Sequence, residues 1–218
     1  MTEQQIFNFN FNPSYSKQNL IEDISNKDVL NFLKKFPDWE NKLVNLFGDR
    51  KSGKTFILKI FNSKNNFLYI NNSIDFNKNF DNFFSVDRLI LDDIEVEEKK
   101  LFSLLNNFIL HKKFMIISSK LPLTNLNFKL NDLNSRLKEF YLIEIKNPSD
   151  KLIYSLVLKY FSDNQVVIKK TLIDHIVKKI DRSYPRISDF LAQLNNSSII
   201  KKKKIDFKLI NDVLNELI

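Results

Sequence analysis

The chain contains one complete phosphate-binding motif, and few folds can accommodate it. Residues 48–55 read GDRKSGKT and match G-x-x-x-x-G-K-[ST] at every fixed position. The motif follows an apolar run with the character of a strand, Leu43–Phe47, and opens a helical pattern over Lys54–Phe61. A strand, a glycine-containing loop and a helix in this order form a phosphate-binding unit of α/β proteins, so the motif predicts both a fold class and a site.

Each part of the motif has a physical role in holding phosphate. Glycines allow the backbone to wrap a phosphate with its N–H groups pointing inward, and the start of the helix adds a favourable dipole. We expect Lys54 to reach the β- and γ-phosphates of ATP, or the β-phosphate of ADP, and Thr55 to supply a hydroxyl to Mg²⁺. The predicted nucleotide contacts are Gly48, Asp49, Arg50, Lys51, Ser52, Gly53, Lys54 and Thr55.

Composition argues against a chance match to this motif. The chain is rich in Asn, Lys, Ile and Phe, yet it has a single alanine, Ala192, and two glycines, both inside the motif. An AT-rich coding sequence would produce this bias, so the two glycines indicate positions where only glycine fits. The same bias raises the lysine content, which leaves two interpretations of the net charge of +8 open: a nucleic-acid partner or compositional drift.

Other residue types exclude several classes of protein. Without cysteine the chain has neither a disulfide framework nor a thiolate metal site, and its two histidines, His111 and His175, exclude a histidine-rich metal centre. No apolar run reaches the roughly 20 residues that cross a membrane. The N-terminus lacks the basic start and apolar stretch of a signal peptide. We therefore expect a cytoplasmic protein with no membrane partner.

Apolar runs and helical patterns alternate through the first two thirds of the chain. Helical spacing covers Asn26–Phe36, Lys54–Phe61 and Glu98–Leu110. Short apolar runs separated by helices predict a parallel α/β sheet covered on both faces. The expected strands are Leu43–Phe47, Phe67–Ile70, Arg88–Leu91, Phe114–Ile117 and Tyr141–Ile145.

The pattern becomes helical throughout after Pro148. Apolar residues recur every three or four positions in four segments, and Ser149 and Asp150 are plausible caps. A further strand is at most a short one over Val166–Ile168. The helical segments are Asp150–Phe161, Thr171–Ile180, Pro185–Leu194 and Asp206–Leu217. We therefore predict a tail over residues 1–12, a nucleotide-binding α/β domain over 13–147 and a small helical lobe over 148–218.

The third expected strand ends in two carboxylates, Asp92 and Asp93. A nucleotide-binding sheet needs an acid at this position to hold Mg²⁺, and a second acid can polarise the attacking water. We expect Asp92 to serve the metal and Asp93 to orient the water. Both residues could instead cap the strand or the helix that follows.

These features together resemble a known family. The loop GDRKSGKT, the strand LILDD and the helices after Pro148 are similar to the AAA+ ATPases, and within them to the replication initiator DnaA and its shorter relative Hda. Three further stretches carry the resemblance: Ser25-Asn26, FPDW at 36–39, and LNFKLNDLNSRL at 126–137. The resemblance covers essentially the whole chain and implies an AAA+ P-loop fold, with a five-stranded parallel sheet and an all-helical lid.

The resemblance also implies roles for individual residues. Arg136 would be an arginine finger, which completes the active site of a neighbouring protein and is worth roughly 10³ to 10⁵ in rate. Arg186 matches the lid arginine (sensor 2) that touches bound phosphates, although Arg182 is a nearby rival. Asn26 lies in the segment that the family places beside the adenine.

One departure from the family concerns the residue called sensor 1. The family usually has an aspartate there, and an ungapped count from residues 133 and 135 places Lys120 at the position. A lysine cannot accept hydrogen bonds as a carboxylate does. We therefore expect weak or absent ATP hydrolysis by the protein itself, unless Ser118 or Ser119 takes the role.

The N-terminal tail carries a second resemblance. Residues 4–9, QQIFNF, fit Q-x-x-Φ-x-Φ, which is similar to the peptide that bacterial proteins insert into the replicative sliding clamp. Gln4 would fix the register by hydrogen bonds, and Phe7 and Phe9 would fill an apolar pocket. In a chain this rich in phenylalanine, a disordered tail or one that packs on the core is an alternative.

The resemblance to Hda implies a negative regulator of replication initiation. Such a protein, bound to nucleotide and to the DNA-loaded clamp, stimulates hydrolysis of the ATP held by DnaA, and it would be associated with the replisome. The alternatives are a self-sufficient ATPase that loads a helicase and an adaptor that anchors DnaA without catalysis. A homodimer is possible. The chain stops at Ile218, directly after the lid, so we expect no sequence-specific DNA recognition by a helix-turn-helix domain.

Overall fold

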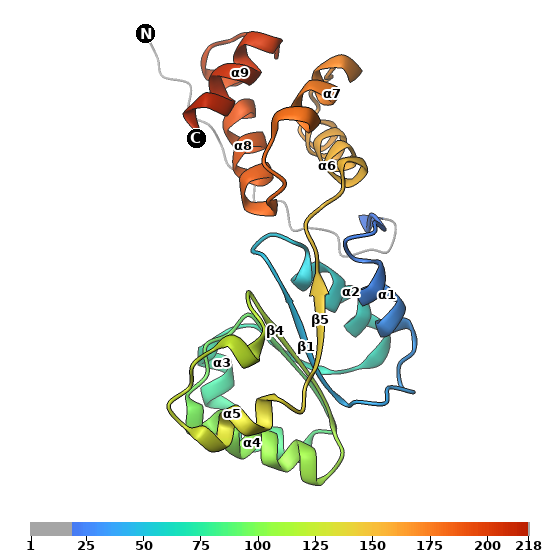
Figure 1. Ribbon diagram of the computed structural model, residues 1–218, viewed down its shortest axis with the longest axis vertical. Helices are drawn as coiled ribbons and strands as arrows, with labels where there is room; N and C mark the ends of the chain where they lie inside the picture. The colour runs from blue at the N-terminus through green and yellow to red at the C-terminus, as the bar shows by residue number, and fades with distance from the viewer. Residues whose placement is uncertain (1–18, 218) are drawn as a thin grey trace.

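The computed structural model describes residues 19–217. The clamp-binding residues predicted in the tail, Gln4, Phe7 and Phe9, lie outside the described residues, so their role stays a prediction. Within residues 19–217, a sheet flanked by helices forms one part of the molecule and a group of helices forms the other (Figure 1). None of the helices in this range is long and apolar enough to cross a membrane.

The sheet has five parallel strands in the order β2-β3-β4-β1-β5. This confirms the predicted architecture. All five carboxyl ends therefore meet at one edge, where loops from different strands can form a common site. The strands are β1 (Leu43–Gly48), β2 (Leu68–Ile70), β3 (Arg88–Asp92), β4 (Phe114–Ser119) and β5 (Tyr141–Ile145).

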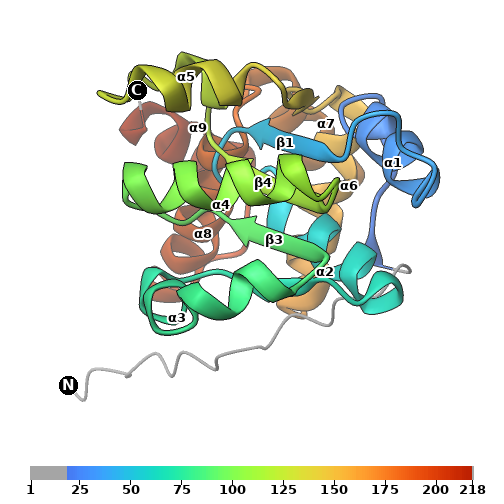
Figure 2. The same ribbon diagram turned by 90° about the horizontal axis from the view of Figure 1, so that it is seen from below.

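Helices cover both faces of this sheet (Figure 2). On one face α1 (Lys27–Lys34) and α2 (Lys54–Asn65) share a core with Ile90 and Ile116. On the other face lie α3 (Ser73–Lys78), the short 3-10 helices η2 (Phe80–Ser85) and η3 (Leu123–Asn125), α4 (Glu98–Leu110) and α5 (Asn131–Leu137). Neighbouring strand residues point to opposite faces, which is why the central strands have apolar residues at consecutive positions, as in Leu89-Ile90-Leu91, and not only at alternate ones.

The four helices after residue 148 form a separate lid with its own apolar core (Figure 1). Two of them begin at side-chain caps: Ser149 accepts a hydrogen bond from the backbone of Leu152, and Asp206 accepts one from Leu209. The segment Val166–Ile168 is not a strand: it pairs with none of the five strands and connects two lid helices. The lid helices are α6 (Asp150–Asp163), α7 (Lys170–Lys179), α8 (Tyr184–Ile200) and α9 (Phe207–Glu216).

Candidate functional site: a phosphate-binding loop at the edge of the sheet

The motif GDRKSGKT forms the connection from β1 to α2, at the edge where the carboxyl ends of the strands meet (Figure 1). Gly48 is required by close packing: a Cβ at this position would lie 2.9 Å from the backbone oxygen of Ile145 on β5. Gly53 is required by conformation, because it caps α2 with a φ of 95° and has no atom within 4 Å of an added Cβ. Gly48 also has a positive φ, of 155°, so both glycines meet a conformational need and Gly48 meets a steric one in addition.

Lys54 is buried inside this loop. Its Nζ donates to the backbone oxygens of Gly48 (2.7 Å) and Asp49 (2.9 Å). Burial lowers the pKa of Lys54 below its usual value, and the carboxylates of Asp93 and Asp92 act in the opposite direction. A phosphate in the loop would give this ammonium group a fully charged partner, which a carbonyl is not. The cradle of loop backbone and buried ammonium fits a nucleotide phosphate.

Asp92 lies at the end of β3 and is almost fully buried. Its carboxylate accepts hydrogen bonds from three hydroxyls: those of Thr55 (2.7 Å), Tyr69 and Ser118. The structure thus brings the two predicted metal residues, Thr55 and Asp92, into direct contact. A carboxylate and a hydroxyl beside a phosphate site are the oxygen ligands that Mg²⁺ uses together with the phosphates of its substrate, so the residues present fit the ion.

Tyr69 was not anticipated from the sequence. It lies in β2, which pairs with β3, and its register places it opposite Ile90, two residues before Asp92. Its ring reaches along the sheet edge so that the hydroxyl bonds Asp92. The sequence shows only a tyrosine near the end of a predicted strand. This does not predict a contact with Asp92 until the pairing of β2 with β3 is known.

The second carboxylate, Asp93, is exposed and has a left-handed backbone with a φ of 52°. Its backbone N–H is held by Oγ of Ser118 at 2.9 Å. Asp93 lines a cavity of about 480 Å³ together with Arg50 and Lys120, beside the phosphate loop. This position is open to water, and the role of Asp93 in orienting that water stays a prediction.

The residues around the sensor 1 position have different hydrogen-bond partners. Ser118 bonds the carboxylate of Asp92, and Ser119 receives a hydrogen bond from Asn45 at 2.8 Å. The side chain of Lys120 is exposed. Asn45, which sequence reasoning missed, is fully buried in β1 and also bonds the backbone of Ile117, so it ties β1 to β4. Of the two serines, Ser118 is therefore the one that bonds Asp92.

The lid approaches the loop through α8. Lys51 forms an ion pair with Asp189 at 2.7 Å, and Oγ of Ser183 lies 3.5 Å from the carboxylate of Asp49. Arg186, predicted to touch the phosphates, is directed elsewhere: its guanidinium donates to the backbone oxygen of Leu217, at the end of α9. The structure therefore brings Asp189, not Arg186, to the loop: the two residues are three positions apart and share a face of α8, but the Arg186 side chain turns to the end of α9.

Arg182, the other arginine considered for sensor 2, does not reach the loop either. Arg182 forms an ion pair with Asp150 at 2.9 Å, at the start of α6. Its side chain is mostly exposed. The sensor 2 assignment of Arg186 stays a prediction, and the structure gives Arg182 a different partner.

Asn26 lies where the α/β domain joins the lid. Its side chain bonds the backbone of Ile21 and Asp23, both at 2.9 Å, which shapes the segment predicted to lie beside the adenine. Asp23 in turn accepts hydrogen bonds from Ser149, the cap of α6. Burial raises the pKa of Asp23, but the hydrogen bonds from Ser149 and Ser25 outweigh this effect and hold it below its usual value.

A lid tyrosine completes this junction. Tyr184, the first residue of α8, is buried, and its hydroxyl lies 3.2 Å from both Oγ of Ser25 and the backbone oxygen of Lys146. Burial raises the pKa of Tyr184 above its usual value. The segment beside Asn26 thus contacts two lid helices, α6 and α8.

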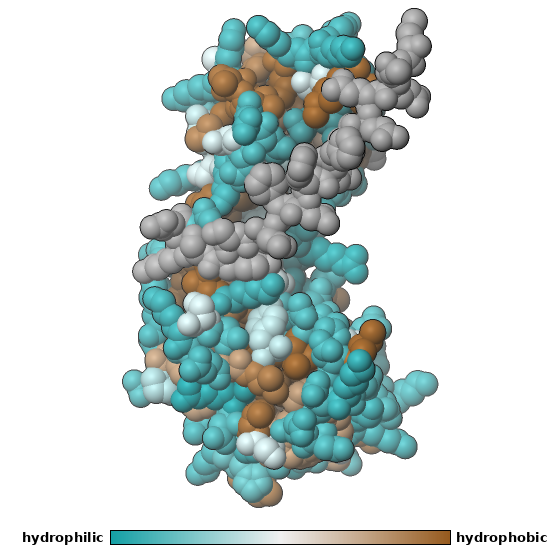
Figure 3. All heavy atoms as spheres, turned by 180° about the vertical axis from the view of Figure 1, so that it is seen from behind, coloured by the Kyte–Doolittle hydropathy of each residue, from teal (hydrophilic) through white to brown (hydrophobic). Residues whose placement is uncertain are grey.

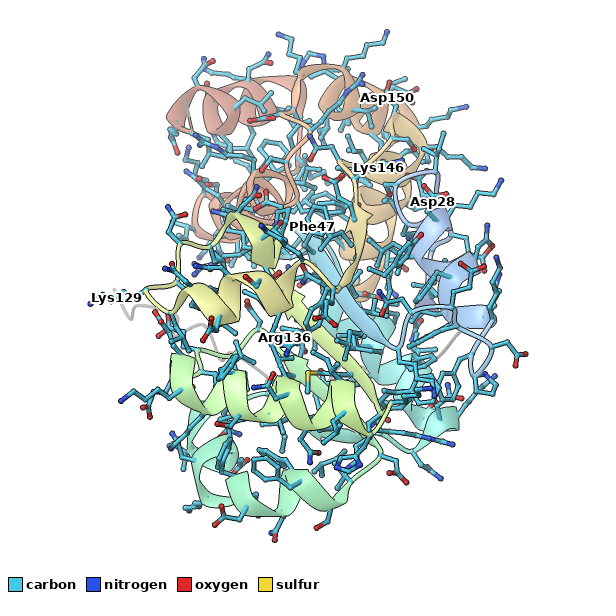
Figure 4. All side chains as sticks on the ribbon, turned by 60° about the horizontal axis from the view of Figure 1, so that its bottom comes forward. Asp28, Phe47, Lys129, Arg136, Lys146 and Asp150 are labelled. Atoms are coloured by element: carbon cyan, nitrogen blue, oxygen red, sulfur yellow. The ribbon has the colours of Figure 1, made fainter. Side chains whose placement is uncertain are left out.

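Arg136 lies on α5 and faces α4, apart from the loop (Figure 4). Its guanidinium bonds Asn106 at 3.0 Å and Glu139 at 2.9 Å, and 42% of the side chain is exposed. Arg136 is not part of the site that its own chain forms.

Comparisons with known proteins agree with this geometry. No family model matches the chain. The chain is 24% identical to the chromosomal replication initiator protein DnaA of Onion yellows phytoplasma (strain OY-M) over 245 aligned positions, which cover 96% of this chain and 48% of that protein. The chain therefore spans about half the length of this curated relative.

Solved structures show the same fold. Domain III of the replication initiation protein DnaA from Thermotoga maritima superposes with a TM-score of 0.71 at 18% identity, over 95% of this chain and 98% of that one. The replication initiator DnaA bound to AMPPCP and single-stranded DNA superposes with a TM-score of 0.65 at 21% identity, over 88% of this chain and 69% of that one. The fold is that of an AAA+ P-loop ATPase of the DnaA domain III type.

Proposed function

We propose that this protein is a nucleotide-bound AAA+ regulator that stimulates hydrolysis of the ATP held by the initiator DnaA. The position of Arg136 carries the proposal. An arginine finger must be exposed, held by its own protein and unable to reach its own nucleotide, and Arg136 has these three properties. In this function the chain's own ADP or ATP, with Mg²⁺, keeps the protein in the shape that presents the finger.

The topology explains why Arg136 cannot act on its own nucleotide. It precedes β5, whose first residue, Tyr141, pairs with Val44 at the start of β1, whereas Gly48 pairs with Ile145 at the other end. Strands rise about 3.3 Å per residue, so the two ends of β5 lie roughly 13 Å apart. Asn41, which precedes β1, donates a hydrogen bond to the backbone oxygen of Glu139 at 2.6 Å. This bond holds the turn between α5 and β5 at the end of the sheet where β1 and β5 begin. Arg136 thus lies at the end of the sheet where the strands begin, and the phosphate loop lies at the end where they finish.

The chain's own site favours binding over turnover. Lys54 and the loop backbone would hold the phosphates, and Thr55 and Asp92 would hold Mg²⁺, which neutralises phosphate charge when bound. Lys120 brings a positive side chain, not a carboxylate, to the sensor 1 position. We therefore expect slow hydrolysis of the protein's own nucleotide, which suits a protein whose catalytic contribution is made in a partner.

Two partners follow from this function. One is DnaA, and the similarity to its domain III supports it, because AAA+ domains of one type can pack against one another. The other is the DNA-loaded sliding clamp, bound through Gln4, Phe7 and Phe9 of the tail. A homodimer that covers Arg136 would compete with DnaA.

The test is phosphate release from radiolabelled ATP bound in advance to the cognate DnaA, measured with DNA-loaded clamp at trace free nucleotide. The native protein should accelerate release only when the clamp is present. Arg136→Ala should reduce the stimulation by at least about 10³-fold and leave nucleotide binding by the protein unchanged. The matched control is Lys138→Ala, an exposed cation at the end of the same helix, which should keep the stimulation.

Other outcomes would overturn the assignment. If stimulation survives Arg136→Ala, Arg136 is not the arginine finger. If it survives deletion of residues 1–10, the tail does not provide the contact with the clamp. If the protein gives no stimulation, but its own ATP turnover rises with single-stranded DNA, it is a self-sufficient ATPase of the helicase-loader kind.

A further inference from the structure

The lid has a hollow at its end far from the sheet. The hollow measures about 770 Å³ and is lined by two connections, α6 to α7 and α8 to α9. The second connection follows α8, which starts beside the phosphate loop and runs for 17 residues, a length of roughly 25 Å. Figure 1 shows both connections on the outer side of the lid. This surface is therefore separate from the nucleotide site and from Arg136.

Lysines from both connections surround this hollow. Lys169 lies on one side and Lys202–Lys204 on the other, with Lys170 and Lys201 next to them. In the part of the chain that the structure describes, no ion pair involves any of these six lysines. The acid on the rim, Asp206, is engaged in capping α9. The hollow thus concentrates positive charge that the protein itself does not neutralise.

Composition alone does not account for this cluster. Residues 148–218 hold 13 of the lysines and arginines against 8 acidic residues, so more than half of the net charge of +8 resides in a third of the chain. Some exposed cations elsewhere meet carboxylates, as Lys51 meets Asp189 and Lys146 meets Asp28. An AT-rich bias raises the lysine content everywhere, but it does not gather lysines from two separate loops around one hollow.

Apolar side chains complete the surface. Phe207 lines the hollow and is 48% exposed, and its ring packs perpendicular to that of His175, with 5.1 Å between the centroids. His175 is itself held by Asn211 at 2.9 Å. Val167 on the opposite loop is 99% exposed. Figure 3 shows apolar atoms exposed at this end of the molecule among hydrophilic side chains.

We infer that this hollow binds a single strand of nucleic acid. The lysines would contact successive phosphates, and Phe207, held in place by His175, would stack on a base, the combination that single-strand sites use. The concave shape favours a strand over an anionic membrane, because a flat bilayer surface cannot follow lysines around a hollow. This inference is independent of the function proposed for Arg136.

The test is binding of a fluorescein-labelled oligothymidylate of about 16 nucleotides, followed by anisotropy with the full chain. The variant carries Lys202→Gln, Lys203→Gln and Lys204→Gln. Each phosphate contact on a single strand contributes about 0.7 to the slope of log affinity against log salt, so the variant should lose about 2 from this slope. The native protein should accordingly weaken about 20-fold more than the variant between roughly 50 and 200 mM salt.

The matched control replaces three exposed lysines of the α/β domain, Lys35, Lys99 and Lys112. It removes the same charge, and Lys112 shares the left-handed backbone of Lys202, with φ values of 51° and 49°. The inference requires the control to keep the native salt slope. Phe207→Leu, which keeps an apolar side chain, should weaken binding at every salt concentration without changing the slope.

Three results would overturn the inference. The lid variant could keep the native salt slope, or the control could lose as much as the lid variant, which would reduce the effect to net charge. The lid variant could also keep oligonucleotide binding and lose binding to phosphatidylglycerol vesicles, which would make the surface a membrane site. Nucleotide binding, measured in parallel, should be unchanged in both triple variants and confirms that each is folded.

Discussion

Removal of one hydroxyl, by Tyr69→Phe, tests how the carboxylate of Asp92, which we propose binds Mg²⁺, is held. Asp92 accepts hydrogen bonds from Thr55, Tyr69 and Ser118, and the variant leaves two of the three. The ring of Tyr69 remains, so its packing is kept. The change therefore acts on the orientation of the carboxylate and not on the core.

The expected effect is on Mg²⁺ and not on the phosphates. Loss of a group that orients a metal ligand typically weakens metal binding 10- to 100-fold. Because Asp92 keeps two partners, we expect the lower end, about 10-fold, which corresponds to about 1.4 kcal/mol. Lys54 and the loop backbone do not depend on Tyr69, so nucleotide affinity without Mg²⁺ should be unchanged.

The assay is a titration of a fluorescent ATP analogue at a series of Mg²⁺ concentrations. For Tyr69→Phe, the Mg²⁺ concentration that gives half of the gain in affinity should rise about 10-fold. The control is Tyr141→Phe, which makes the same chemical change on β5, at the opposite edge of the sheet, where the ring stacks on Phe32 at 4.8 Å.

Two results would contradict this role of Tyr69. An unchanged Mg²⁺ requirement in Tyr69→Phe would show that this hydroxyl does not orient Asp92. An equal shift in Tyr141→Phe would show that loss of any tyrosine hydroxyl has the same effect.

The loop glycines and the junction with the lid give two further predictions. Gly48→Ala should lower the free energy of unfolding in urea by about 2–4 kcal/mol, because the new Cβ meets the backbone of Ile145 at 2.9 Å. Gly53→Ala should cost about 1 kcal/mol from its φ alone, and equal losses would contradict the steric argument. The lowered pKa of Asp23, due to hydrogen bonds headed by that from Ser149, stabilises the fold above the ordinary carboxyl range near pH 4, and this is lost as the pH falls. Asp23→Asn should therefore melt lower at neutral pH but lose less stability on acidification, and parallel melting curves against pH would exclude this linkage.

Local patterns were sufficient for much of this protein. The five strands and the main helices are confirmed because their signals lie within single segments: apolar runs such as Leu89-Ile90-Leu91 for strands buried on both faces, and three- and four-residue spacing for helices. The phosphate loop was also readable, since all its functional atoms come from eight consecutive residues. The contact of Thr55 with Asp92 followed from the rule that parallel strands end at one edge.

The tertiary structure alone decided which groups meet between segments. Tyr69 bonds Asp92 because β2 pairs with β3, and Asn45 bonds Ser119 because β4 lies beside β1 in the order of strands. Neither neighbour can be read from a linear pattern. The direction of Arg186 towards α9, and the approach of Asp189 to the loop, depend on the rotation of α8 about its own axis. Packing of the lid sets that rotation, and packing is a property of surfaces that come together only when the chain has folded.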